Sequence, residues 1–333
     1  MVYLFFALLI GCGSSDREGD DAGECDDGAD NDLDGDFDCD DADCDASPDC
    51  DGTGDDDDDD DDTDTDTDTD TDTDSTAPTV PEEFGDLLVY LYTGFDDPAV
   101  RREAIAALEP LMLAVDLSED PIDRAYTGGA LLDAAATAAV TVPASVDLAE
   151  QRMVGLVYNS RVDLESHVSG MVDPNQICLQ SPSVVYYDRT FVSDPTCFDS
   201  GGCSELATTA ESRWESIIAE IWSDPVVDFY RLQHDGRAVV VARGHLPEVA
   251  PADVGQNEWA QDFELAIWIE NPSQPDETLR LTARWFEMNI GGVSDDLALA
   301  LIREGIQDQF DDSDDFLEGI LCNNDRAHVP NRD

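Results

Sequence analysis

The spacing of apolar residues changes along the chain and divides its 333 residues into four segments. An unbroken apolar run, 2–10, opens the sequence, polar and acidic residues then dominate, and regular apolar spacing appears only in the last segment. Because a folded core needs regularly placed apolar side chains, we place the globular domain at 82–333. The preceding chain divides by composition into 1–11, 12–52 and 53–81.

The globular segment opens with helical signals. An Asp-Pro pair at 97–98 is typical of a helix start, because aspartate caps free backbone N–H groups and proline fits the first helical position. Apolar residues keep helical spacing over 100–115, within which Pro110 predicts a kink or a break. A second, alanine-rich helix is predicted over 120–135.

From about residue 152 the apolar residues alternate, which predicts strands. The predicted strands cover 154–158, 162–166, 184–192, 226–232, 238–242, 263–269 and 279–285. Asp235-Gly236, between two of these strands, is a tight-hairpin signal. Residues 213–222 fit either a helix or a strand, and we favour the helix.

The chain ends with a predicted helix over 294–310 and a short helix over 313–321. Helices come first, then consecutive strands, then a terminal helix. This order predicts an α+β fold, with an antiparallel sheet and a C-terminal helix covering one face, preceded by a disordered acidic segment.

The net charge narrows the classes of function. The chain has 79 acidic residues, 16 arginines and no lysine, which gives a formal charge of −63. Ordinary nucleic-acid binding is excluded, because phosphate contacts need clustered basic residues. Binding to an anionic membrane through a basic patch is excluded for the same reason.

The acidity is concentrated near the N-terminus, where 32 acidic residues lie within 13–74. Residues 53–81 contain an unbroken aspartate run, 55–62, followed by alternating threonine and aspartate. Such a segment buries no apolar surface and repels itself, so we predict a disordered linker. Its fully extended reach is about 90 Å, enough to hold the globular domain away from a membrane.

The apolar run ends in Leu9-Ile10-Gly11-Cys12, which resembles the lipobox of bacterial lipoproteins. The resemblance implies cleavage of a signal peptide, 1–11, and attachment of palmitate-type acyl chains at Cys12. Two or more chains anchor a protein stably. The residue after Cys12 is glycine, which by analogy with lipoprotein sorting favours the outer membrane of a bacterial cell envelope. The alternative is a secretory signal with a chance cysteine.

The second segment contains aspartates at the spacing of a calcium loop, in which oxygens at positions one, three and five surround a cation and glycine at six allows a sharp turn. Gly35 takes position six, and the candidate ligands are Asp30, Asp32, Asp34, Asp36, Asp38 and Asp41. The pattern resembles the loops of EF-hands, dockerins and thrombospondin type 3 repeats, and short metal-binding repeats of bacterial surface proteins. The resemblance implies calcium binding; the alternative is a solvated acidic tether.

Apart from Cys12, the cysteines fall into two groups of four. The first group is Cys25, Cys39, Cys44 and Cys50, and the second is Cys178, Cys197, Cys203 and Cys322. An even number in each region predicts disulfide bonds within each region, in an oxidising compartment. Zinc is the alternative for the first group, although hard aspartate oxygens outnumber thiols there. The pairing within each group is open.

Motifs for catalysis are missing: the sequence has no GxSxG, HExxH, Walker or GxGxxG pattern. The four histidines are isolated, and we interpret His234 and His245 as structural. On the face opposite the apolar stripe of the last two strands, Trp268, Arg280, Arg284 and Phe286 form a candidate patch for an anionic or sugar-like ligand. The alternative is a packed layer in which these arginines pair with Glu264 or Glu270 across strands.

The sequence favours an envelope-anchored surface lipoprotein with a calcium-binding segment and a globular domain of binding or structural role. Its partners are the membrane, through the lipid, and an unidentified protein or glycan. The alternative is an envelope-tethered hydrolase. A deep pocket with converging polar groups would favour the enzyme, and a flat sheet face would favour binding.

Overall fold

The computed structural model describes residues 80–319 except 122–123, 174–175, 216–219, 254–257 and 292. All of them belong to one unit of the chain, Ser75–Asp333. The predicted lipidation site, the aspartate-rich loop, the linker and Cys322 lie outside the described residues.

The strands of the described residues form one antiparallel sheet in the order β1-β9-β8-β6-β5-β3-β2, with β4 beside β3 and β7 beside β8. The strands are β1 (Arg152–Ser160), β2 (Val184–Phe191), β3 (Glu205–Glu215), β4 (Glu220–Ser223), β5 (Val226–His234), β6 (Arg237–His245), β7 (Ala250–Pro251), β8 (Glu258–Glu270) and β9 (Thr278–Asn289). With the helices described next, this sheet confirms the predicted α+β class.

Local turn chemistry joins β5 to β6. Asp235 and Gly236 have φ angles of 48° and 77°, as a tight hairpin of this twist requires, and the two strands pair from His234↔Arg237 onward. The predicted pair formed by β8 and β9 is also confirmed, with Leu265 opposite Ala283.

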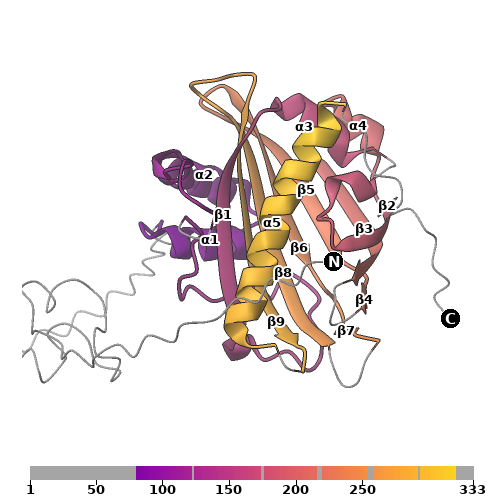
Figure 1. Ribbon diagram of the computed structural model, residues 1–333. Coiled ribbons are helices and arrows are strands. Elements are labelled where there is room, and N and C mark those ends of the chain that lie inside the picture. The colour runs from indigo at the N-terminus through magenta and orange to yellow at the C-terminus, as the bar shows by residue number, and fades with distance from the viewer. Residues whose placement is uncertain are drawn as a thin grey trace, which may run out of the picture. The chain divides into compact units, whose positions relative to one another are not determined.

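Helices α1 (Phe84–Thr93) and α2 (Pro98–Ala114) cover one face of the sheet (Figure 1). Asp97 caps α2 by accepting a hydrogen bond from the Ala99 N–H at 2.7 Å. Pro110 lies inside α2 without ending it. Buried residues of the two helices and of the sheet form the largest core, among them Leu88, Leu91, Ile105, Val241, Leu265 and Trp285.

Helix α5 (Asp295–Leu317) lies along the other face of the sheet, together with α3 (Leu164–Met171) (Figure 1). Ile302, Ile306 and Phe310 of α5 pack on Leu156 and Phe286 of the sheet. The remaining short helices are η4 (Leu148–Glu150), η5 (Gln176–Leu179) and α4 (Pro195–Asp199). No helix in the described part of the chain is long and apolar enough to cross a membrane.

Four sequence-based predictions of secondary structure are wrong. The described residues of 120–135 are not helical: Tyr126 forms a β-bridge with Gly155, and the Trp285 indole N–H donates to the Ala130 carbonyl. The predicted strand 162–166 is instead the start of α3, because Asp163 caps that helix. Residues 213–222 form strand where they are described, and the two terminal helices are one continuous helix, α5.

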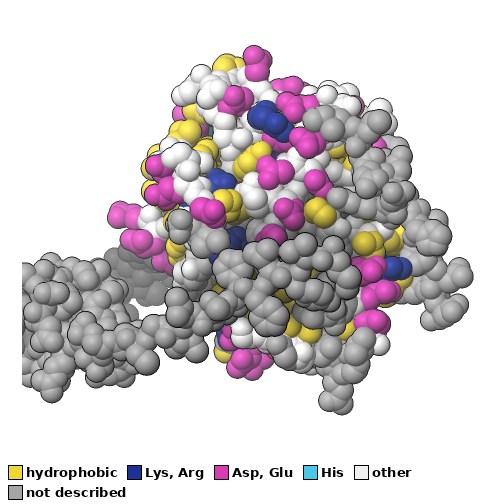
Figure 2. All heavy atoms as spheres, viewed as in Figure 1, with side chains coloured by type: hydrophobic (Ala, Val, Ile, Leu, Met, Phe, Trp, Pro, Cys, Tyr) yellow, Lys and Arg dark blue, Asp and Glu magenta, His cyan; other side chains and the backbone are white. Residues whose placement is uncertain are grey.

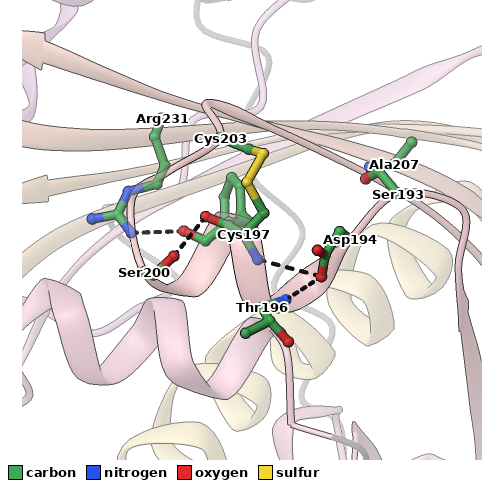
Figure 3. The surroundings of a disulfide bond; sticks show 9 residues. Ser193, Asp194, Thr196, Cys197, Ser200, Cys203, Ala207 and Arg231 are labelled. Carbon is green, nitrogen blue, oxygen red and sulfur yellow. Dashed lines mark hydrogen bonds between the residues drawn. A yellow bond between two sulfur atoms is a disulfide. The ribbon is translucent and has the colours of Figure 1, made fainter.

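A disulfide bond joins Cys197, within α4, to Cys203, which follows that helix (Figure 3). The carboxylate of Asp194 accepts hydrogen bonds from the Thr196 and Cys197 N–H groups and so caps this helix (Figure 3). Arg231 of β5 donates to the Phe198 carbonyl at 3.1 Å, which ties α4 to the sheet.

Cys178 is also disulfide-bonded. Every cysteine other than these three lies outside the described residues. Our prediction of pairing within each region therefore names Cys322 as its partner. Mass spectrometry of non-reduced peptides tests this pairing, and a bridge from Cys178 to any of residues 25–50 would contradict it.

Candidate functional site

A cavity of about 190 Å³ lies between α5 and the face of the sheet opposite α1 and α2. Its apolar lining includes Trp214, Trp259, Trp268, Phe229, Leu246 and Leu301. Its charged lining includes Arg189, Arg280, Arg284, Asp262 and Glu264. On the face that carries α5, acidic side chains are scattered over the visible surface among apolar and uncharged ones (Figure 2).

The alternation of β8 and β9 places the charged residues inside. Residues 262, 264, 266 and 268 share one face of β8, and 280, 282 and 284 share the same face of β9. Glu264 is directly opposite Arg284, and Trp268 is directly opposite Arg280. Cross-strand pairing therefore brings acid against base and ring against guanidinium.

Arg284 is held between two carboxylates. Its Nε donates to Asp262 Oδ1 at 3.2 Å, and its Nη2 donates to Asp262 Oδ2. The same Nε lies 3.7 Å from Glu264 Oε2. Burial raises the pKa of both carboxyl groups, and the Arg284 charge opposes that shift. The Glu264 side chain is 32% exposed although burial raises its pKa; because it lines the cavity, we interpret this accessible surface as facing the cavity.

Arg280 is 4% exposed and lies between two rings, with its guanidinium carbon 4.5 Å from the centroid of Phe310 and 5.8 Å from that of Trp268. It donates to Ser313 Oγ at 2.7 Å and lies 3.6 Å from Asp314 Oδ1. Burial lowers its pKa to about 10, so the guanidinium is protonated at neutral pH.

Arg189 belongs to β2, at the edge of the sheet farthest from β1, and lines the same cavity. It donates to the Met171 carbonyl at 3.2 Å and to the Tyr187 hydroxyl at 3.0 Å. Within the described part of the chain it forms no ion pair with a carboxylate. Among the described residues, its charge acts on the carboxyl group of Glu264.

Two further polar groups at the cavity have no hydrogen-bond partner among the described residues: His245 Nδ1 and Trp259 Nε1. Burial, and then the nearby charge of Arg243, lower the pKa of His245 to about 4. The imidazole is therefore neutral at pH 7.

Ser160, His167 and Asp314 have the residue types of a hydrolase triad but not its arrangement. Ser160 Oγ donates to Asp314 Oδ1 at 2.6 Å, and His167 Nε2 lies 2.8 Å from the same hydroxyl. In a triad the carboxylate orients the histidine instead. Ser160 and the Asp314 side chain are 0% exposed, and burial lowers the pKa of His167 well below its usual value. The geometry fits a structural network that joins β1 to α5.

The structure brings three of the four residues of the predicted ligand patch to the cavity: Trp268, Arg280 and Arg284. Phe286 is fully buried in the core beneath α5 and does not line it. The alternative of cross-strand pairing is also present, since Arg284 pairs with Glu264, whereas Glu270 accepts from Arg237 through its backbone carbonyl.

Sequence reasoning did not identify Arg189, His245 or α5 as parts of the site. The polar alternation of residues 262 and 264 was a usable signal, because two acids on the same strand face as Trp268 are unusual in a buried layer. The described residues bring no three histidine, cysteine or acidic side chains together as metal ligands.

No protein-family model and no curated protein matches the sequence. Among solved structures, the chain is similar to a START superfamily protein from Mycobacterium smegmatis (12% identity, 51% of this chain, 99% of that chain, TM-score 0.30). It is also similar to a STAR-related lipid transfer protein fragment from Xanthomonas axonopodis (12% identity, 52% of this chain, 97% of that chain, TM-score 0.34). A third similar structure is that of the Zhui aromatase/cyclase from Streptomyces sp. R1128 (11% identity, 51% of this chain, 92% of that chain, TM-score 0.31).

Proposed function

We propose that the globular domain binds a small molecule in the cavity beneath α5. The observation that carries this proposal is a partly enclosed space of about 190 Å³ with aromatic walls and a few converging polar groups. Its volume matches a ligand about the size of one ring, because a cavity of roughly 150 Å³ accommodates benzene.

The alternative of a hydrolase receives partial support from the same cavity, since it holds groups with shifted pKa values. Nucleophilic hydrolysis also needs an accessible nucleophile beside a base. Among the described residues, the Ser–His hydrogen bond is the one between Ser160 and His167, and Ser160 is fully buried. Binding is therefore the function that the geometry favours.

Filling the cavity should abolish binding. Gly305 of α5 lines the cavity, and a Cβ built there meets only Ser181 Oγ within 4 Å, at 3.6 Å. We expect Gly305→Leu to fold and to lose binding of benzyl alcohol, because its side chain would occupy the ligand's space. Calorimetry and the fluorescence of the three tryptophans in the lining provide the measurement.

Gly305→Ala is the matched control. It removes the helical glycine, which favours folding by about 0.5–1 kcal/mol, but adds a single methyl group. It should retain binding. Equal affinities of wild type, Gly305→Ala and Gly305→Leu would show that the probe binds elsewhere, and no binding to wild type would contradict the proposal.

We further propose that the domain is tethered to a bacterial envelope, at the outer membrane, through lipidated Cys12. The lipobox-like Leu9-Ile10-Gly11-Cys12 supports this. Metabolic labelling with a palmitate analogue should mark the wild type and not Cys12→Ala. Continued labelling and membrane association of the alanine variant would refute the anchor.

The aspartate-rich segment is proposed to bind calcium, with Gly35 at the turn and Asp32 and Asp34 among the ligands. We expect weak affinity, about 10⁻⁴–10⁻³ M, typical of extracellular modules. Calorimetry of the full chain and of Asp32→Asn/Asp34→Asn provides the comparison. Equal responses to calcium and magnesium, unchanged by the substitutions, would reduce the segment to a charged tether.

A further inference from the structure

We infer that the ligand of this cavity carries a carboxylate or a similar oxyacid group on a body about one ring in size, and that Arg280 and Arg189 receive that group. The inference rests on the proposed function, because it assigns the chemical class of the ligand in the same cavity. It is carried by the supply of hydrogen-bond donors, the charge balance and the rigidity of the two arginines.

Hydrogen-bond donors without a partner among the described residues lie around the cavity. A guanidinium has five N–H donors, and Arg280 uses one of them in a hydrogen bond with a described residue, at Ser313. Arg189 uses two. The Nε atoms of both arginines are buried and have no hydrogen-bond partner among the described residues. The same holds for Trp259 Nε1. Unpaired buried donors destabilise the empty site, so a ligand rich in acceptors fits it best.

The charge balance points the same way. Arg284 is paired with Asp262, and Arg280 lies 3.6 Å from Asp314, which does not line the cavity. Arg189 has no carboxylate partner among the described residues, so the described lining holds three guanidinium groups and two carboxylates, those of Asp262 and Glu264. The lining itself therefore carries one more positive than negative charge.

Both arginines are held in place before a ligand arrives. Phe310 and Trp268 flank Arg280, and Arg189 lies 5.4 Å from the ring centroids of Tyr187 and Phe229. A planar guanidinium matches the geometry of a carboxylate, and a fixed one loses less conformational entropy on binding. The apolar walls are left for the body of the ligand.

A cationic ligand is the competing class, since the carboxylate of Glu264 accepts no hydrogen bond from a described residue. That carboxylate lies 3.7 Å from Arg284, and the charges of Arg189 and Arg280 also act on it. A cation would therefore meet three guanidinium groups and two carboxylates in the lining. The unpaired guanidinium donors and the excess of one positive charge favour the acid.

The test compares three probes of nearly one shape: benzoate, neutral benzamide and cationic benzylammonium, each titrated calorimetrically at pH 7 into the full chain. We expect benzoate to bind at least about tenfold more tightly than benzamide, because hydrogen bonds to a charged group are the stronger ones. Arg280→Gln should remove that preference and leave benzamide binding unchanged.

Arg243→Gln is the matched control, because Arg243 is also 4% exposed on the same sheet but on the opposite face, beside Phe95 and Asp96. It should keep the preference for benzoate. Arg189→Gln is the second variant, for the case that Arg280→Gln fails to fold. Because Arg189 pairs with no carboxylate among the described residues, its replacement breaks no ion pair there. It should lower the affinity for benzoate and leave that for benzamide unchanged.

Two outcomes would overturn the inference while sparing the proposed binding function: equal affinity for benzoate and benzamide, or tightest binding of benzylammonium. Retention of the benzoate preference in both Arg280→Gln and Arg189→Gln would also overturn it. Failure of all three probes to bind would overturn the inference and the proposed function together.

Discussion

Replacing Asp314 with alanine is expected to lower the free energy of unfolding by about 3–5 kcal/mol, because it breaks a buried ion pair and leaves the other charge uncompensated. The Asp314 side chain is 0% exposed and lies 3.6 Å from Arg280. It also accepts hydrogen bonds from Ser160 Oγ at 2.6 Å and from the Arg161 N–H at 3.0 Å. Urea unfolding of wild type and variant measures the difference.

The neighbouring residue supplies the control. Asp315 pairs with Arg161 at 2.9 Å, but both side chains are about half exposed. A surface pair of this kind contributes about 0–1 kcal/mol, so Asp315→Ala should change stability little. Similar losses for Asp314→Ala and Asp315→Ala would contradict the view that the buried network fastens the end of α5 to β1.

Much of the sheet was predictable because its signals are local. Asp235-Gly236 specifies a turn from two adjacent residues, and the alternation of 263–269 with 279–285 identifies two strands that pair directly. The cap at Asp97 likewise needs only its own neighbours. Such patterns are the ones that one sequence reveals.

The errors arose where distant residues decide the structure. Trp214 and Ile221 have helical spacing, yet they are opposite each other in β3 and β4, and Trp214 packs edge-on against Trp259. In the alanine-rich stretch, Tyr126 pairs with the backbone of Gly155 in β1 instead of continuing a helix. Tertiary pairing outweighed helix propensity in both places.

The candidate site shows the same division. Trp268, Arg280 and Arg284 were identified from the sequence because they follow period two on adjacent strands. Arg189 and Gly305 come from β2 and α5, which meet those strands only in the folded sheet. No spacing rule relates them, so the cavity itself could not be predicted.

A second large effect is expected on acidification, through His245. Its pKa is lowered from 6.5 to about 4, first by burial and then by the charge of Arg243. As the pH falls, His245 therefore takes up a proton near pH 6.5 in the unfolded chain but only near pH 4 in the folded chain. The contribution of the neutral imidazole to the free energy of unfolding is complete above pH 6.5, declines as the pH falls from 6.5 to about 4, and is lost below pH 4. This contribution is about 3 kcal/mol.

The experiment isolates His245 by difference. The raised pKa values of Asp262 and Glu264 act in the opposite direction, because those groups take up protons first in the folded chain, whereas His167 acts in the same direction as His245. All three are present in both wild type and His245→Gln, so their effects cancel when the two are compared. Urea unfolding at pH 7, 6, 5 and 4 should show the stability advantage of wild type shrinking by about 3 kcal/mol towards pH 4. A difference that stays constant with pH would show that His245 takes up its proton equally in the folded and unfolded chains.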